Sequence, residues 1–227
     1  FTPAAGVSGP VVISYTLSDG TTTSSGTLTV NVGTNAVPVA NAATISPSED
    51  TPIGVPLSGS DSDGTIASVT ITAGPSAAQG QLLYDADGNP GTPAVAVPLG
   101  TALTPAQAAT VTFVPAPNYN GPVDPVSFIV TDNAGASSSA ASVTINNVTP
   151  VNDAPVAGPD SASTPFDTPI ANINVLGNDS DPDGDVLSVS GASVNPAQGT
   201  VTVNPDGSIN FTPAAGVSGP VVISYTL

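Results

Sequence analysis

The first seventeen residues of the chain, FTPAAGVSGPVVISYTL, are repeated without change as its last seventeen, at 211–227. The two copies start 210 residues apart, and self-similarity at a fixed distance is the sequence signature of a tandem array. Within the repeated segment, apolar and polar residues alternate from Val11 to Leu17, as in a strand with one buried and one solvated face. The repeat therefore predicts β-strand domains arranged in series.

Two similar segments predict where one domain passes into the next. Residues 35–40 read NAVPVA, and residues 152–157, which begin 117 positions later, read NDAPVA. These boundaries give the C-terminal strands of a first repeat at 1–34, a complete β-sandwich repeat at 35–150 and the N-terminal part of a further repeat at 151–227. This last repeat is of the same type as the first, so its final hairpin should resemble residues 18–32. We therefore expect the chain to be a segment of a longer polypeptide.

Alternating apolar runs recur along the chain, and turn sequences separate them. The runs lie at 27–32, 126–130, 201–203 and 209–211, and the turns read DADG at 85–88 and NPDG at 204–207. Strands at this spacing with Gly, Pro and Asp turns favour an all-β, immunoglobulin-like sandwich.

One short segment favours a helix instead of a strand. Residues 104–109 read TPAQAA, in which Thr104 can act as the N-cap and proline suits the first helical position. The segment lies in an insertion around 91–110 that the other domain type lacks.

The charge balance excludes several classes of function. The chain has 17 acidic residues and no Lys, Arg or His, which gives a formal net charge of −17. Nucleic acids and anionic membranes are therefore excluded as partners, because both are bound through Lys and Arg. No His or Lys can activate a serine, and no Trp is present to line a glycosidase cleft, so we expect no enzyme. The chain contains no run of eighteen apolar residues, so we expect no membrane insertion of this segment.

The acidic residues are clustered, which favours a bound cation. The densest cluster is DSDPDGD at 179–185, with four carboxylates in seven residues. Such carboxylates repel each other unless a cation joins them, and hard oxygen ligands suit Ca²⁺ better than Mg²⁺. The EF-hand pattern is not met, because no Glu closes a twelve-residue loop from Asp179 or Asp181. For Asp85, Asp87 and Asp206 we favour the alternative, a solvated turn without an ion.

The linkers predict a second kind of cation site. Asp153 lies in the linker at 152–157, and Glu49, Asp50 and Asp132 lie in loops that could face such a junction. An ion there would stiffen the array against its own repulsion. At the first linker the matching position is Ala36, so we expect the two junctions to differ in stiffness.

Several motifs together carry a family resemblance. NDAPVA, NVLGNDSDPDGD, NPDGSINFTP and SYTLSDG resemble the tandem cadherin-like and bacterial immunoglobulin-like repeats of giant bacterial surface adhesins. The resemblance implies immunoglobulin-like or cadherin-like β-sandwich domains arranged as a rod, with calcium at loops and junctions. The calcium ligands that it implies are Asp179, Asp181, Asp183, Asp185, Asp61, Asp63, Asp153, Glu49, Asp50 and Asp132.

The leading functional hypothesis is a structural repeat of a large extracellular adhesin or surface fibre, acting as a calcium-rigidified spacer in cell adhesion or biofilm. Its partners would be neighbouring repeats, at the bacterial cell surface or in a secreted matrix. One alternative is a self-assembling filament, in which residues 1–34 of one molecule complete residues 151–227 of the next by strand exchange. A further alternative is a carbohydrate-binding module, for which Tyr84, Tyr119 and 21–23 are the only hints.

Overall fold

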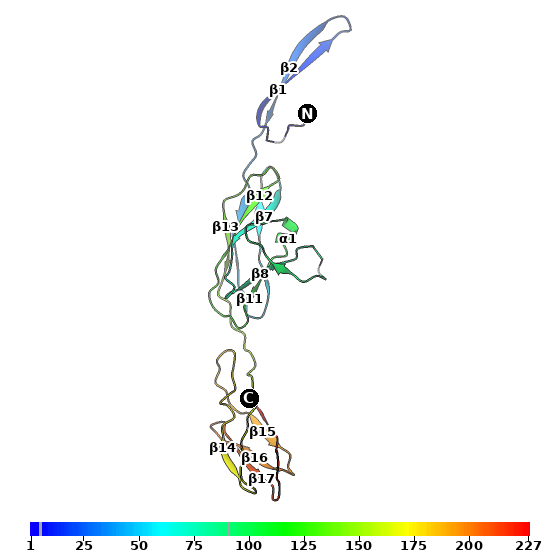
Figure 1. Cartoon of the computed structure of the whole chain (residues 1–227). Coiled ribbons are helices and arrows are strands. Elements are labelled where there is room, and N and C mark those ends of the chain that lie inside the picture. Colours follow the sequence, from blue (N-terminus) through cyan, green and yellow to red (C-terminus); the bar gives the residue numbers. More distant parts are fainter. Residues whose placement is uncertain (5, 90) are drawn as a thin grey trace. The chain divides into compact units, whose positions relative to one another are not determined.

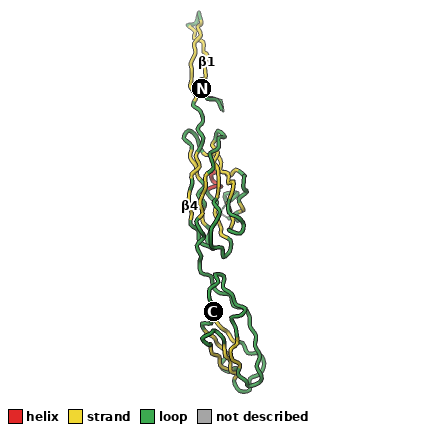
Figure 2. The backbone as a smooth tube through the Cα atoms, turned by 90° about the vertical axis from the view of Figure 1, so that its left-hand side faces the viewer, coloured by secondary structure: helices red, strands yellow, loops and turns green. Residues whose placement is uncertain are grey.

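The computed structural model describes residues 1–4, 6–89 and 91–227, which form two compact units, Phe1–Pro150 and Val151–Leu227 (Figure 1). Strands, turns and loops account for nearly all of both units, and the short helix is the red segment in Figure 2. The predicted all-β class is therefore confirmed. Within the described residues, no helix is long and apolar enough to cross a membrane.

The first unit begins with a long hairpin of strands β1 (Gly9–Ser18) and β2 (Thr23–Val32). They pair antiparallel without a break, from Gly9 opposite Val32 to Ser18 opposite Thr23. The alternation predicted one buried face, but Tyr15 is 47% exposed and Leu28 is 53% exposed. The reason is that none of the described residues of 1–34 belongs to the buried core of the unit, so this apolar face remains uncovered.

Residues 35–150 form a sandwich of two main sheets and a small third pair. Most pairings are antiparallel, but β4 runs parallel to β13. The larger sheet has the order β10 (Ala102–Leu103), β7 (Ile66–Ala73), β12 (Val126–Asp132), β13 (Ala141–Ile145) and β4 (Ala43–Ile45). The second sheet has the order β5 (Ile53–Gly54), β11 (Thr112–Pro115), β8 (Gly80–Tyr84) and β9 (Val95–Ala96). The third pair is β3 (Val39–Asn41) with β6 (Ser58–Ser60).

The core of this domain comes from the apolar faces of both main sheets. Strand β12 alternates strictly between buried and half-buried residues, as its sequence predicted. Its Phe128 is fully buried, and so is Phe113 of β11 in the other sheet. Because a domain with few large side chains depends on such contacts, we expect these two aromatic residues to contribute strongly to stability.

The predicted helix is confirmed as α1 (Pro105–Ala108). Thr104 is its N-cap and accepts a hydrogen bond from the Gln107 N–H, and Gln107 Oε1 accepts one from the Thr104 N–H at 3.0 Å. This reciprocal pair is a capping box.

Residues 151–227 contain two sheets with longer loops between the strands. Val175, Ile209 and Phe211 are buried and belong to the core of this unit. One sheet has the order β14 (Ile170–Ile173), β17 (Ile209–Pro213) and β16 (Gly199–Val203). The other pairs β15 (Gly191–Val194) with β18 (Ile223–Thr226).

The two domain types share a local geometry at the start of one strand. Gly80 opens β8 with φ +148°, and Gly199 opens β16 with φ +156°. A Cβ at either position would lie 2.6 Å from an aromatic ring, that of Phe113 or that of Phe211. Only glycine fits such a close approach, so the pairs Gln79-Gly80 and Gln198-Gly199 occupy equivalent places in the two domain types.

Candidate functional site

In the second unit, the linker segment docks on the densest acidic loop. The Asp153 N–H donates a hydrogen bond of 2.6 Å to Asp183 Oδ2, and Asn152 Nδ2 donates one of 2.8 Å to the Asp153 carbonyl. Asp181 Oδ1 accepts hydrogen bonds from the backbone N–H groups of Asp183 at 2.9 Å and Asp185 at 3.3 Å. The linker is therefore held by the backbone of Asp153, while its carboxylate takes no part in these bonds.

The first unit repeats this arrangement at the other linker. The Ala36 N–H donates to Asp63 Oδ2 at 3.0 Å, and Asn35 Nδ2 donates to the Ala36 carbonyl at 2.9 Å. Asp61 Oδ1 accepts a hydrogen bond of 3.4 Å from the Asp63 N–H, as Asp181 does from Asp183. The hydrogen bond from the linker to the acidic loop uses a backbone N–H. The first linker can therefore have Ala36 where the second has Asp153 and still form this hydrogen bond.

Asp132 joins the site of the first unit. Its side chain is only 2% exposed, and Oδ2 accepts a 2.8 Å hydrogen bond from Asn35 of the linker. Oδ1 accepts bonds from the N–H groups of Ala134 at 2.9 Å and Ala136 at 2.8 Å. The bond from Asn35 is the main reason why the pKa of Asp132 is lowered, against the opposing effect of desolvation. Asp132 therefore stays ionised and connects the linker to the end of β12.

Two side-chain oxygen atoms from different loops lie close to Gly64. A Cβ placed at Gly64 would overlap with both Asp61 Oδ2 and Asn133 Oδ1, which belong to different loops. Asp61 Oδ2 is buried and has no hydrogen-bond partner, whereas Asn133 Oδ1 accepts a 2.8 Å bond from the Thr65 N–H. Glycine at position 64 thus lets two side-chain oxygen atoms, of the kind that calcium takes as ligands, approach the backbone closely.

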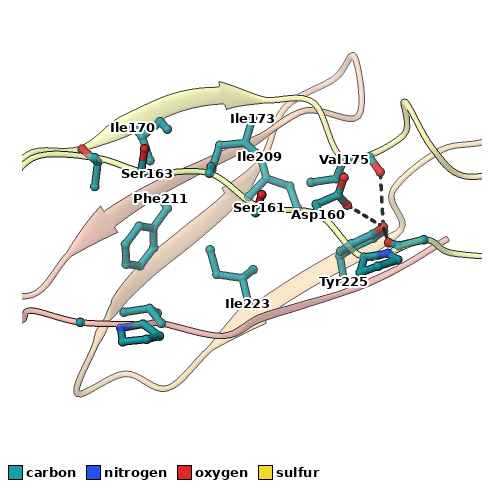
Figure 3. A pocket seen from close by; sticks show the side chains of 17 residues that line it. Asp160, Ser161, Ser163, Ile170, Ile173, Val175, Ile209, Phe211, Ile223 and Tyr225 are labelled. Atoms are coloured by element: carbon teal, nitrogen blue, oxygen red, sulfur yellow. Dashed lines mark hydrogen bonds between the residues drawn. The ribbon is translucent and has the colours of Figure 1, made fainter.

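The structure does not bring the four aspartates of 179–185 to one point. Asp179 instead accepts a 2.7 Å hydrogen bond from the Gly158 N–H and lies 3.2 Å from the Tyr225 hydroxyl. Tyr225 also reaches Asp160 Oδ2 at 3.0 Å (Figure 3). Burial, together with the charges of Asp160 and Asp179, raises the pKa of Tyr225, so it remains a neutral donor. Asp185 contributes its backbone N–H, and its side chain is exposed.

The other predicted ligands lie elsewhere. Glu49 is buried with 1% exposure, and its N–H donates to the Thr149 carbonyl at 3.0 Å. Asp50 is exposed and has φ +59°. Across 1–4, 6–89 and 91–227, no three acidic side chains gather as a group able to hold a metal ion. Any cation site would therefore need amide or carbonyl oxygens in addition to carboxylates.

Some of the site residues were not among the predicted ligands. Asn35 and Asn152 hold the linkers, Asn133 faces Asp61, and Asp160 faces Tyr225. The asparagines of the linkers could have been found, because both repeated linker motifs begin with Asn. The carbohydrate-binding alternative gains no support from Tyr84 and Tyr119, which are partly buried against the core.

Comparison with known proteins gives a family. A family model described as a bacterial Ig domain matches residues 35–146 and 152–227. The two matched segments begin at the two linker asparagines, Asn35 and Asn152. No curated protein matches the chain.

Proposed function

The chain belongs to the bacterial Ig domain family, and from this premise we propose that it is a non-enzymatic spacer of a bacterial surface adhesin or fibre whose linkers are stiffened by calcium. An immunoglobulin-like structural repeat is what the family itself supports. The extracellular location, the role in adhesion or biofilm and the calcium ion are parts of the proposal.

The proposal rests on one observation: both linkers form the same hydrogen bonds with the acidic loop of their unit. In both units an Asn side chain closes the linker turn, and the next residue donates its N–H to the second aspartate of an Asp-x-Asp loop. Each linker is thus tied to the acidic loop of the domain that it enters. Fixing a linker in this way limits the angles available between successive domains, which is what a spacer requires.

Calcium fits the oxygen atoms at this place in the first unit. Asp61 Oδ2 and Asn133 Oδ1 both lie close to Gly64, and Asp63 and Asp132 hold the linker through hydrogen bonds. In the second unit Asp181 and Asp183 occupy the matching positions. A bound calcium ion would supply the positive charge that side chains cannot, since the chain has no Lys, Arg or His.

The surface charge suits a spacer that must not adhere to its own copies. A net charge of −17 without cationic side chains makes neighbouring copies repel each other, which keeps an extended array soluble. The same charge opposes close contact between successive domains. Divalent cations are abundant outside cells, so such an array would be stiff there.

The test is thermal unfolding of the 227-residue chain in calcium and in a calcium chelator, followed by circular dichroism. Calcium at 100 times its dissociation constant stabilises a site by about 2.7 kcal/mol. For a domain of this size, that raises Tm by on the order of 10 °C. The same concentration of magnesium should give a smaller shift, because magnesium demands stricter octahedral geometry.

Paired variants locate the ion. Asp61→Asn with Asp63→Asn should abolish the calcium shift of the first unit, and Asp181→Asn with Asp183→Asn that of the second. The matched control is Asp85→Asn with Asp87→Asn, in an exposed turn where Asp85 Oδ1 accepts a bond from the Gly88 N–H. Equal Tm values in calcium and chelator would refute the calcium part of the proposal.

A further inference from the structure

Six residue pairs in the chain consist of an aspartate or an asparagine followed directly by glycine. They are Asp19-Gly20, Asp63-Gly64, Asp87-Gly88, Asn120-Gly121, Asp183-Gly184 and Asp206-Gly207. In such a pair the glycine nitrogen can attack the side-chain carbonyl carbon of the preceding residue, because glycine has no Cβ to hinder the approach. Each pair is therefore chemically able to rearrange, and the fold determines which of them has a free glycine nitrogen.

The glycine N–H is held by a hydrogen bond in five of the six pairs. The acceptors, at 2.8–3.2 Å, are Ser18 Oγ for Gly20, Asp85 Oδ1 for Gly88, and the carbonyl groups of Val148, Asp181 and Asn204 for Gly121, Gly184 and Gly207. An amide held in this way must break its hydrogen bond before its nitrogen can turn toward the side chain, which slows the attack. Within the described residues, the Gly64 N–H donates no hydrogen bond.

Gly64 also has an oxygen atom beside it that can take up the amide proton. A Cβ built on Gly64 would lie 2.5 Å from Asp61 Oδ2, which is buried and has no hydrogen-bond partner. The Cβ position and the amide nitrogen are attached to the same carbon atom, so Asp61 Oδ2 lies close to the Gly64 nitrogen as well. An ionised carboxylate only accepts protons and hydrogen bonds, so this oxygen suits the removal of the amide proton.

We propose that Asp63-Gly64 is a site of spontaneous isoaspartate formation, which releases the first linker from its acidic loop. Asp63 holds this linker, because its Oδ1 and Oδ2 lie 3.2 and 3.0 Å from the Ala36 nitrogen, whose N–H they accept. The side chain of Asp63 is exposed, so the water that the reaction needs can reach it.

The reaction closes a five-membered ring and then opens it. The Gly64 nitrogen bonds to Cγ of Asp63 in its acid form, Asp61 Oδ2 takes the amide proton, and the Cγ–OH bond breaks. The hydroxyl leaves with that proton as water, and a cyclic imide remains. Water then adds to either ring carbonyl: addition at Cγ restores Asp63, whereas addition at the main-chain carbonyl gives isoaspartate. One water is released and one is taken up, so no other reactant is required.

Isoaspartate cannot hold the linker as Asp63 does. Its backbone is one carbon longer and its side chain is one carbon shorter, so the carboxylate no longer lies opposite the Ala36 N–H. The second linker is spared, because Asp183, which accepts the Asp153 N–H at 2.6 Å, is followed by a glycine whose N–H is held. The modification itself is independent of the proposed spacer function, but its consequence, a first junction that loosens with age, rests on that function.

The test is prolonged incubation of the 227-residue chain at physiological pH and temperature in a calcium chelator. Electron-transfer mass spectrometry of its peptides then distinguishes isoaspartate from aspartate at each position. We expect isoaspartate to form at Asp63 about fivefold faster than at the other four Asp-Gly pairs, which is the factor that one intramolecular hydrogen bond supplies. In urea, where the hydrogen bonds of the fold are lost, the five pairs should react at similar rates.

Two variants test the roles of the neighbouring groups. Asp61→Asn keeps the size of the side chain but removes the proton acceptor, so it should slow the reaction at Asp63 several-fold. The matched control is Asp181→Asn, the same change in the acidic loop of the second unit, which should leave the rate at Asp63 unchanged. Asp63→Glu keeps a carboxylate but cannot close the five-membered ring, so this variant should form no isoaspartate at position 63.

Hydrogen exchange of single backbone amides measures the release of the linker. In the aged wild type the Ala36 amide should exchange faster than in fresh protein, while the Asp153 amide of the second linker should be unchanged. In aged Asp63→Glu neither amide should change. The inference is overturned if Asp63 reacts no faster than the other Asp-Gly pairs in the folded chain, if the same order of rates persists in urea, or if ageing leaves exchange at Ala36 unchanged. Because every measurement is made in a chelator, failure of the calcium proposal would not alter these outcomes.

Discussion

The domain at 35–150 and the hairpin at 1–34 contain matching strands in opposite environments. Aligning Thr131-Asp132 with Ser18-Asp19 makes Phe128 of β12 equivalent to Tyr15 of β1. Phe128 is fully buried, whereas Tyr15 is 47% exposed. Both strands alternate apolar and polar residues, and both have a regular antiparallel neighbour. The difference is the second sheet, which covers β12, whereas the described residues of 1–34 contribute only the β1-β2 pair. Alternation therefore predicts which face can be buried, and only the assembled sandwich buries it.

The largest expected effect comes from removing the aromatic side chain in each strand, Phe128 in β12 and Tyr15 in β1. Phe128→Ala should destabilise the domain at 35–150 by about 4 kcal/mol, because it removes a fully buried ring and leaves a cavity. Tyr15→Ala at the equivalent position of the hairpin should leave the unfolding of that domain unchanged. Urea unfolding followed by circular dichroism measures both. A similar loss of stability in the two variants would show that the hairpin covers the core of the domain in solution.

A smaller effect separates the two copies of the identical segment. Tyr225 donates to groups that include the Gly158 carbonyl at 3.1 Å and Asp160, whereas Tyr15 lies over Gly26 in the hairpin. Tyr225→Phe should lower the free energy of unfolding of the second unit by about 1–2 kcal/mol, because it leaves partly buried acceptors without a donor. Tyr15→Phe, the same substitution in the same sequence, should have no measurable effect on unfolding of either domain.

The two tyrosines also predict different behaviour at high pH. The pKa of Tyr225 is raised above the ordinary value of 10.0, so ionisation is favoured in the unfolded chain. The stability that Tyr225 contributes is therefore complete below pH 10 and is lost as the pH rises above it. Tyr225→Phe should reduce this dependence of stability on pH. Equal slopes of Tm against pH in the wild type and the variant would contradict the prediction.

The smallest expected effect concerns Asp132 and Asp206. The pKa of Asp132 is lowered from 3.8 chiefly by the Asn35 side chain, and that of Asp206 by Ser208 within its own turn. A lowered pKa gives stability that is present above the ordinary value and is lost as the pH falls below it. Asp132→Asn should therefore flatten the acid side of the Tm profile of the first unit. Asp206→Asn should leave that unit unchanged and affect the second.

The local features of the fold could be predicted from sequence because their partners are close in the chain. The capping box of Thr104 and Gln107 joins residues three apart, and the Asp-x-Asp loops close on backbone N–H groups two residues on. The alternation of 11–17, 126–130 and 209–211 predicted strands that the structure contains. The domain boundaries, the ligand assignments and the calcium ion remain predictions.

Long-range contacts of the site could not be predicted in this way. The bond from Asn35 to Asp132 joins residues 97 apart, and that from Tyr225 to Asp160 joins residues 65 apart. Ala36 and Asp153 hold their linkers through backbone N–H groups, which every residue except proline has, so the side chain gives no signal. Ala36 stands where the second linker has Asp153, and from this exchange we expected the two junctions to differ in stiffness. The backbone hydrogen bonds that hold the two linkers are nevertheless the same.

The sequence by itself determined the β-strands, their turns, the short helix and a surface of one charge sign, because these follow from local alternation, local hydrogen bonds and composition. Tertiary structure decided which faces of the strands are covered, and which aspartates meet Tyr225 and which meet a linker. The physical reason is that these contacts join residues far apart in the chain, and a local pattern does not specify which distant element packs against it.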